Sequence, residues 1–317
     1  MKQALDVFRT LADPTRLRIL CLLRAMELSV GELAQVLGQS QPRVSRHVRI
    51  LADAGLAERR KEGSWVFLSL GDMGRVAPVF TTVDALTAGD DGWMAADVAR
   101  LAAVRADRAA AAERYFAGHA AEWDAIRSLH VPEAQVEAAM LRAIGPEPLR
   151  QLVDIGTGTG RMIELFGATA RAALGVDRSP EMLRLARAKL AEAGLERAEL
   201  RQGDMYALPL ADGSADVAVL HQVLHYAQQP AAAVAEAGRL LAPGGRLLIV
   251  DFAPHDREEL RSSGAHARLG FADDQIAGWF AAAGLEGGAV DQLDGDLTVK
   301  LWLGRRPAAT VGKVLAA

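Results

Sequence analysis

A glycine-rich stretch in the second half of the chain has the residue types and spacing of a nucleotide-binding loop. It reads LVDIGTGTGRM over residues 152–162, a hydrophobic run followed by three glycines at alternate positions. Glycine allows the backbone to approach a ligand closely and to form tight turns. Asp154 precedes the loop, and Asp177 ends the next hydrophobic run, ALGVD. We expect Asp177 to accept hydrogen bonds from the two hydroxyl groups of a ribose.

Histidine and tyrosine side chains follow a later hydrophobic run and are candidates for catalysis. These are His221, His225 and Tyr226 in the segment HQVLHY. His221 is the best placed of them, because the end of that strand faces the ligand. Further candidates, for a lid over the site, are Tyr115, His130, His255 and His266. Each isolated histidine has an alternative interpretation as a surface residue or a hydrogen-bonded core residue.

Alternating strands and helices must position these residues. The hydrophobic runs QLVDI, ALGVD, AELRQGD, ADVAVLHQVLHY and LAPGGRLLIVDF are separated by helical patterns, and a final pair follows near 285–291 and 297–304. This order predicts an α/β doubly wound, Rossmann-like fold over residues 148–307. Ligands of such sheets bind at the carboxyl ends of the strands, where the loops after the first two strands meet.

The first part of the chain predicts a mainly α, winged helix-turn-helix. Asp13-Pro14 is a typical helix start, and Ser29 with Glu32 forms a capping box before a short helix. After the turn GQS, we expect Ser40 to cap a second helix that ends at Gly55. Two short helices joined by a tight turn form a helix-turn-helix.

The outward face of the second helix carries side chains suited to phosphates and base edges. These are Gln41, Arg43, Ser45, Arg46, His47 and Arg49. The following segment, LAERRKEGSWVFLSL, predicts a β-hairpin that turns at Glu62-Gly63, with Arg59, Arg60 and Lys61 near its tip. A basic wing beside a polar helix favours binding of double-stranded DNA over a merely solvated surface.

Length and charge divide the 317-residue chain into regions. Residues 1–70 contain 11 Lys and Arg against 7 Asp and Glu, a net charge of +4; the rest contains 25 against 33, a net charge of −8. We expect a DNA-binding and dimerisation domain over 1–90, a helical linker and cap over 91–147, the α/β domain over 148–307 and a tail over 308–317. Only the basic first region is expected to meet a polyanion.

Cysteine content and hydropathy limit the remaining options. The single cysteine, Cys21, excludes an internal disulfide and a thiolate-rich metal site, and its place in a helical pattern predicts a small core residue. The charged, amphipathic start of the chain indicates neither a signal peptide nor a membrane span. We therefore expect a cytoplasmic protein without membrane contact.

Residues 4–70 resemble the ArsR/SmtB winged-helix repressors, on LADPTRLRILCLL and QSQPRVSRHVRILADAGLAERRKEGSWVFLSL. The resemblance implies a homodimer formed through Leu5, Val7, Phe8 and a helix near 73–87, and release of operator DNA when a ligand binds. It implies no metal ligand here, because Ser29 and Gly31 stand where arsenic-responsive members carry cysteines. The 73–87 segment also lacks the histidines of zinc-responsive members.

Residues 148–305 resemble class I S-adenosylmethionine-dependent methyltransferases, on GTGTG, the QGD at 202–204 and the PGG at 243–245. The resemblance implies that the glycine loop approaches the methionine part of the ligand, that Asp204 accepts from the adenine amino group, and that Met182 and Met205 sandwich the ring. Core packing is the alternative for both methionines. The implied cofactor-binding set is Asp154, Gly156, Thr157, Gly158, Asp177, Arg178, Met182, Asp204, Met205 and His221.

Other functions fit the motifs less well. A nicotinamide-binding domain favours G-x-G-x-x-G, whereas the spacing here is G-x-G-x-G. Methylation of nucleic-acid bases is disfavoured by the acidic second region and by the segment LHQVLHY, which lacks an N/D-P-P-Y/F motif. The chain also lacks the cysteines required for arsenite methylation.

The fused arrangement resembles ArsR-type regulators with a methyltransferase-like domain that occur beside methionine-cycle genes. We therefore expect a repressor that binds S-adenosylhomocysteine or S-adenosylmethionine as its effector. The alternative is an active small-molecule methyltransferase with an autoregulatory DNA-binding domain.

Overall fold

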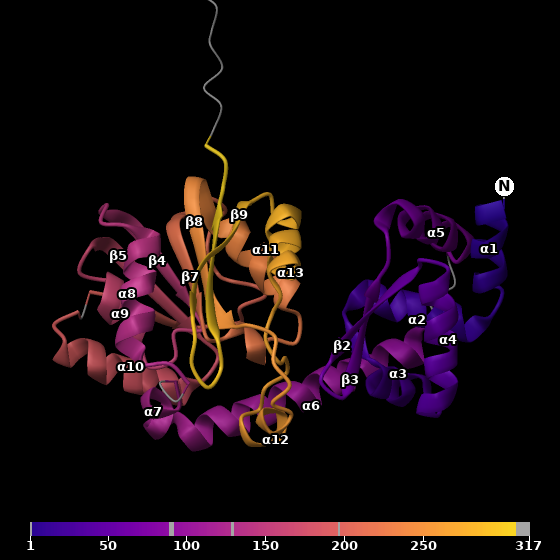
Figure 1. Ribbon diagram of the computed structural model, residues 1–317, viewed down its shortest axis with the longest axis horizontal. Helices are drawn as coiled ribbons and strands as arrows, with labels where there is room; N and C mark the ends of the chain where they lie inside the picture. Colours follow the sequence, from indigo (N-terminus) through magenta and orange to yellow (C-terminus); the bar gives the residue numbers. More distant parts are fainter. Residues whose placement is uncertain (1, 89–91, 128–129, 196, 309–317) are drawn as a thin grey trace, which may run out of the picture. The chain divides into compact units, whose positions relative to one another are not determined.

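The computed structural model, shown in Figure 1, describes residues 2–88, 92–127, 130–195 and 197–308. The chain divides into two compact units, 1–111 and 112–317. Helix α6 (Ala95–His119) contains the boundary between the two units. The segment 91–147 expected as linker and cap is therefore shared between them.

The first unit is a winged helix-turn-helix. Its elements are α1 (Lys2–Leu11), α2 (Pro14–Ala25), β1 (Leu28–Ser29), α3 (Val30–Leu37), α4 (Gln41–Asp53), β2 (Ala57–Glu62), β3 (Trp65–Leu70) and α5 (Met73–Leu86). The three strands form one antiparallel sheet in the order β1-β3-β2. Helices α3 and α4 are the two helices predicted for the DNA-binding motif.

Local hydrogen bonds explain where the helices of this unit begin and end. Asp13 accepts from the backbone nitrogen of Arg16, and Ser29 forms the predicted capping box with Glu32. The expectation for Ser40 is wrong in one respect, because its side chain makes no capping hydrogen bond at the start of α4. Gly38 adopts a left-handed conformation with φ of 64°, which lets the chain turn between α3 and α4.

The hairpin turns one residue later than the sequence pattern predicts. Glu62 pairs with Trp65 across the strands, so the connecting residues are Gly63 and Ser64 rather than Glu62 and Gly63. Gly63 has a φ of 58°, and two-residue hairpin turns favour residues that accept a positive φ. The glycine therefore occupies the first position of the turn.

The first half of α6 packs on the first unit. Leu101 and Val104 are buried in the core that α2, α3 and α4 form. Asp97 is almost fully buried and accepts hydrogen bonds from the guanidinium groups of Arg18, at 2.5 and 2.6 Å, and of Arg100, at 2.6 Å. Arg100 also donates to the carbonyl oxygen of Val36, at the end of α3. This ion-pair network fixes the start of α6 on the helix-turn-helix.

The second unit is a doubly wound α/β domain with a seven-stranded sheet in the order β6-β5-β4-β7-β8-β10-β9. The strands are β4 (Leu149–Ile155), β5 (Ala170–Asp177), β6 (Glu199–Gln202), β7 (Ala215–His221), β8 (Leu241–Phe252), β9 (Glu286–Leu293) and β10 (Val299–Arg305). Strand β10 runs antiparallel to its neighbours β8 and β9, whereas β4 to β8 pair in parallel. The glycine loop follows the central strand β4.

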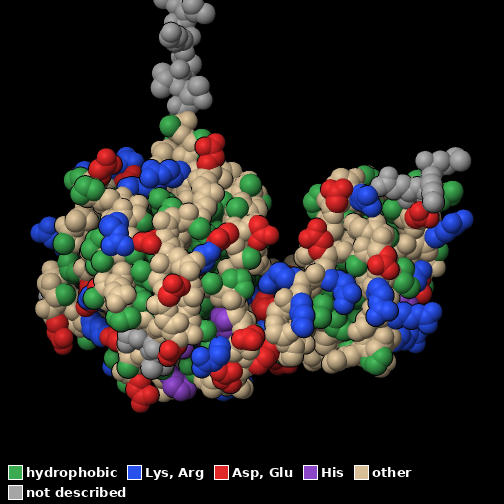
Figure 2. All heavy atoms as spheres, viewed as in Figure 1, with side chains coloured by type: hydrophobic (Ala, Val, Ile, Leu, Met, Phe, Trp, Pro, Cys, Tyr) green, Lys and Arg blue, Asp and Glu red, His purple; other side chains and the backbone are tan. Residues whose placement is uncertain are grey.

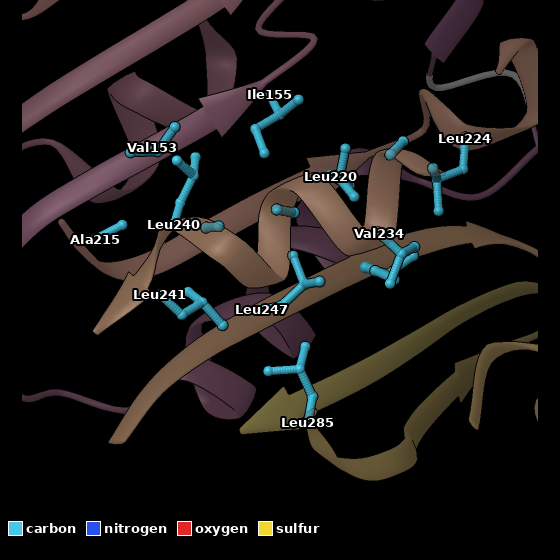
Figure 3. Close-up of a cluster of buried hydrophobic side chains, with 14 of the residues drawn as sticks. Val153, Ile155, Ala215, Leu220, Leu224, Val234, Leu240, Leu241, Leu247 and Leu285 are labelled. Carbon is cyan, nitrogen blue, oxygen red and sulfur yellow. The ribbon is translucent and has the colours of Figure 1, made fainter. Parts of the chain in front are cut away.

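Helices cover both faces of this sheet (Figure 1). Residues of α8 (Glu133–Ile144), α9 (Arg161–Phe166) and α10 (Pro180–Glu192) contribute to the core on one face. Residues of α11 (Pro230–Leu240) and α13 (Asp273–Ala282) contribute to the core on the other. Figure 3 shows part of that second core, where side chains of β4, β7 and β8 meet those of α11. The remaining elements are η1 (Ala120–Glu122), α7 (Trp123–Arg127), η2 (Leu224–Tyr226) and α12 (Glu259–Ser263).

Within the described residues, none of the helices combines the length and the apolar character needed to cross a membrane.

Candidate functional site

The glycine loop after β4 has the backbone geometry that the sequence predicts. Gly156, Gly158 and Gly160 have φ angles of 74°, 52° and 87°, which L side chains rarely adopt. A side chain at Gly156 would overlap the side chain of Val223 in the loop after β7. The loop therefore requires glycine both for its conformation and for close packing.

Two aspartates, one buried and one half-buried, stabilise this loop through hydrogen bonds. Asp154 is buried, and the Thr157 hydroxyl donates to it at 2.6 Å; burial raises the pKa of Asp154 to about 7. The Asp177 carboxylate accepts from the backbone nitrogens of Gly158 and Ser179, each at 2.8 Å, and burial raises its pKa. Each carboxylate oxygen of Asp177 has a further lone pair for a ligand hydroxyl.

The other expected cofactor residues lie in different environments. Met182 is buried in the first turn of α10, whereas Met205 is half-buried against the core. Asp204 is exposed and accepts from the backbone nitrogen of Tyr206, and Arg178 is also exposed. His221 is buried at the end of β7, and burial lowers its pKa to about 3, so this imidazole is neutral at physiological pH.

Helix α7 lies against the glycine loop. The Trp123 indole nitrogen is 3.3 Å from the position that a Cβ atom at Gly158 would occupy. The Thr159 hydroxyl donates to Asp124 at 2.8 Å, and Lys189 of α10 forms an ion pair with the same carboxylate. The segment that the sequence predicts as a cap is thus held to the loop by packing and by charge.

A cavity of about 300 Å³ lies beside this loop and is lined by aromatic and histidine side chains. The lining includes Tyr115, Trp123, His130, His225, Tyr226 and His266. The ring of His225 is 4.0 Å from that of Tyr226 and 4.2 Å from that of His266, measured between centroids. Trp123 contributes both to the cavity and to the packing over Gly158, so the cavity and the loop share a wall.

His225 is oriented by a buried carboxylate. Its Nδ1 lies 2.8 Å from Asp251 Oδ1, and Asp251 also accepts from the backbone nitrogens of His225 and Phe252. This pairing favours the tautomer that carries its proton on Nδ1. The Nε2 atom is buried without a hydrogen-bond partner in the part of the chain that the structure describes. The arrangement can accept a proton from a molecule in the cavity.

The structure groups most of the predicted catalytic and lid candidates in one place. His225, Tyr226, Tyr115, His130 and His266 all line the cavity. His221, the best placed candidate from the sequence, is not among the lining residues. His255 is not among them either, but its ring lies 6.0 Å from that of Phe252 and 6.4 Å from that of His266, between centroids.

Sequence reasoning missed the residues that connect these candidates. Asp251 ends a strand that the pattern treats as plain core, and Trp123 and Phe252 have no motif of their own. A structural signal marks the place: Gln222 and Ala265 are the non-glycine residues with positive φ among those described, at 48° and 53°. Gln222 lines the cavity, and Ala265 lies between two lining residues. Such strained positions concentrate at functional sites.

Some of the expected DNA-contacting side chains of the first unit are exposed, and others contact residues of the same unit. Gln41, Arg43, Arg46 and Arg49 are exposed on α4, and Ser45 is half-buried. Figure 2 shows Lys and Arg side chains gathered over the lower part of this unit. His47 is largely buried, 3.7 Å from an Asp13 oxygen, and burial lowers its pKa.

The wing differs from the expectation in one side chain. Arg59 and Lys61 are exposed on β2, whereas the Arg60 guanidinium forms ion pairs with Glu27, at 2.9 Å, and Glu62, at 2.6 Å. It also lies over the Phe67 ring. Strand alternation explains the difference, because neighbouring residues point to opposite faces.

The expected dimer helices present apolar side chains to solvent. Leu5 and Phe8 of α1 are 47% and 67% exposed, and Met73 and Leu86 of α5 are 57% and 81% exposed. Val7 instead packs against the core of its own unit.

No group of three or more His, Cys, Asp or Glu side chains that could hold a metal ion occurs among the described residues.

Comparison with known proteins finds relatives of both units. Residues 13–59 match the model of the bacterial regulatory protein arsR family. The arsenic resistance transcriptional regulator ArsR1 of Pseudomonas putida is 40% identical over 101 residues, which cover 30% of this chain and 75% of that protein. The chain belongs to the arsR family of regulators. Residues 153–249 match the model of a methyltransferase domain.

Other relatives match the second unit. The uncharacterized methyltransferase YcgJ of Bacillus subtilis is 34% identical over 107 residues, or 33% of this chain and 42% of that protein. A solved complex of the Haloferax volcanii Trm112 methyltransferase activator and a putative methyltransferase matches with a TM-score of 0.52 and 21% identity, covering 62% of this chain and 97% of the other. That likeness shows the fold. This arsR-family chain spans about a third to a half of the first curated relatives it matches.

Proposed function

We propose that the chain is a homodimeric repressor that binds double-stranded operator DNA through α4 and the wing, and whose second unit binds S-adenosylhomocysteine or S-adenosylmethionine as effector. The glycine loop and Asp177 fit such a ligand, because Gly156 and Gly158 give the loop its positive φ angles and a carboxylate lies at the carboxyl end of β5. The genes controlled would be those of the methionine cycle, following the resemblance of the fused arrangement.

The observation that carries this proposal is that α6 contributes to both units. Its first half is fixed to the helix-turn-helix through Asp97, Arg18 and Arg100. Its second half supplies Tyr115 and His119 to the cavity beside the glycine loop. A ligand that changes the packing of the second half would therefore act on an element that also supports α3.

The choice between the two nucleotides depends on one charge and one methyl group. S-adenosylmethionine has a positive sulfonium, whereas S-adenosylhomocysteine has a neutral thioether. A tenfold preference requires only about 1.4 kcal/mol of difference in binding free energy. The effector releases DNA to the extent that it binds the DNA-free conformation more tightly.

The test is fluorescence anisotropy of the full-length protein on labelled DNA from its own upstream region, at fixed salt, titrated separately with each nucleotide. We expect one nucleotide to weaken DNA binding more than the other. Asp177→Asn should shift that response to higher nucleotide concentration. Asp216→Asn is the matched control, because Asp216 also accepts backbone hydrogen bonds but lies at the start of β7. Unchanged DNA affinity at saturating nucleotide would contradict the effector proposal.

A second candidate function is methyl transfer to a small molecule. It is favoured by the position of His225, whose Asp251-supported imidazole lines a cavity that shares a wall with the glycine loop. Transfer of label from S-adenosylmethionine to a metabolite in a cell extract tests this candidate. Binding of the nucleotide without transfer would favour the effector role alone.

A further inference from the structure

We propose that the cavity beside the glycine loop binds a small, flat, uncharged molecule with a weakly acidic hydroxyl group, such as a phenol, and that Nε2 of His225 accepts its proton. This inference concerns a second ligand. It rests on the cavity and not on the effector proposal, so either can fail without the other.

The walls of the cavity determine the shape of the ligand. Its volume of about 300 Å³ is at the lower end of the range for small-molecule sites. Rings enclose it from separate segments: Tyr115 of α6, Trp123 of α7, Tyr226 of η2 and Phe252 of β8. The rings of Phe252 and His266 are stacked, with an interplanar angle of 15°. Aromatic walls of this kind pack best against another flat ring.

The charge environment favours a neutral ligand. Burial lowers the pKa of His130 and His266 and raises that of Tyr226, so these three side chains are uncharged near neutral pH. Arg127 at the cavity is compensated by Glu133, at 3.1 Å, and by Asp124, at 3.5 Å. A net negative charge on the ligand would lose its hydration without gaining an uncompensated cation, because Arg127 is the Arg or Lys side chain of this lining. Besides His225, the titratable lining residues are Tyr115, His119, Glu122, Arg127, His130, Tyr226 and His266, and Asp251 contacts His225 from β8.

An unpaired hydrogen-bond acceptor, Nε2 of His225, is the reason for proposing a hydroxyl group on the ligand. Asp251 holds the Nδ1 proton of His225, so Nε2 presents its lone pair. Nε2 of His225 is buried and lacks a protein partner among the described residues, and so does Nδ1 of His266. A buried acceptor without a partner is costly, and a ligand hydroxyl would satisfy it.

The proton transfer conserves charge within the site. The ligand O–H bond breaks, its electron pair stays on oxygen, and the proton forms a bond to Nε2 of His225. The resulting imidazolium is stabilised by the Asp251 carboxylate at 2.8 Å, and it forms an ion pair with the ligand oxygen. An ionised oxygen in this cavity is the type of nucleophile that accepts a methyl group from a sulfonium donor.

Binding of 4-nitrophenol to the full-length protein tests the inference without any methyl donor. Its anion absorbs visible light and its neutral form does not, so ionisation in the bound state is read directly. At a pH about one unit below its own pKa the free probe is roughly one-tenth ionised. We expect the anion band to grow and saturate as the protein is added. His225→Gln should bind at least about tenfold more weakly, or bind without the anion band.

Two further variants and a second probe separate the proton acceptor from general stability. Asp251→Asn should reduce the bound anion fraction. Asp273→Asn should leave it unchanged, because Asp273 likewise accepts from a ring N–H, that of Trp302, but does not line the cavity. Nitrobenzene, which lacks the hydroxyl, should bind wild type and His225→Gln alike, which shows that the cavity is intact.

Three results would overturn the inference. They are failure of wild type to bind 4-nitrophenol, binding without the anion band, and an equal anion band in His225→Gln. If His225→Gln also fails to bind nitrobenzene, its cavity is altered and the Asp251→Asn variant becomes the test. An undiminished anion band of 4-nitrophenol in Asp251→Asn would then refute the role of His225 as proton acceptor.

Discussion

The two units differ in where the polar side chains of their expected binding sites lie. In the first unit the arginines of α4 lie on the surface, and some apolar side chains of α1 and α5, such as Phe8 and Leu86, are also exposed. In the second unit the polar groups near the glycine loop are buried, including Asp154, His221, His225 and Asp251. A surface of exposed cations suits a long polyanion that remains hydrated. Buried polar groups suit a small molecule that is enclosed and loses its water.

Because of this difference, we expect substitutions in the two sites to have different effects on binding and on stability. Exposed charges act on a partner and contribute little to folding. Buried polar groups affect stability and proton affinity together, because each must be paired or neutral in the folded state.

The largest effect is expected from Arg43→Ala combined with Arg46→Ala. Loss of two exposed cations from α4 should weaken operator binding by about a hundredfold or more. It should leave the unfolding temperature and nucleotide binding unchanged. Anisotropy on operator DNA at several salt concentrations measures the effect, with Arg171→Ala on exposed β5 surface as the control. Equal losses in the control would show that net charge, not the face of α4, governs binding.

A smaller effect, on stability, is expected within the first unit. Asp97→Ala removes a carboxylate that is only 3% exposed and leaves Arg18 and Arg100 without their ion-pair partner. The free energy of unfolding should therefore fall by about 2 kcal/mol. Asp84→Ala removes the partner of Arg24, where both side chains are about half exposed, and should cost less than about 0.5 kcal/mol. Denaturant unfolding of both variants gives the comparison. Similar values for the two would contradict the contrast between buried and exposed charges.

The third effect is a pH dependence in the second unit. The pKa of Asp154 is raised to about 7 by burial, so its protonated form favours the folded state. Its contribution to stability is therefore complete below the unfolded pKa, near 4, and is lost as pH rises through about 7. The unfolding free energy of wild type relative to Asp154→Asn should fall by at most about 1.4 kcal/mol per pH unit in that window. A constant difference would mean that Asp154 is ionised throughout.

Periodicity and turn chemistry predict most of the fold. The helix-turn-helix, the hairpin, the glycine loop and the order of strands follow from local patterns, because caps, glycine turns and alternation are short-range effects. The errors at Ser40 and at the hairpin turn are local too, each a matter of one hydrogen bond or one residue.

The arrangement of the candidate site could not be predicted in the same way. His225 and Asp251 are 26 residues apart, and only the pairing of β7 with β8 brings them together. The involvement of Arg60 with Glu27 likewise depends on how the wing packs on the loop before β1. Such contacts are set by tertiary structure, which the spacing of residue types does not contain.

The single cysteine gives this molecule a practical property. Cys21 is half-buried beside the core of the first unit, and burial raises its pKa to about 11. Thiols react as thiolates, and at neutral pH only about one in ten thousand of these would be ionised. A cysteine introduced at an exposed position of either unit would thus react with a maleimide dye much faster than Cys21 does. Pairs of such dyes would let single-molecule energy transfer follow the separation of the two units as ligands are added.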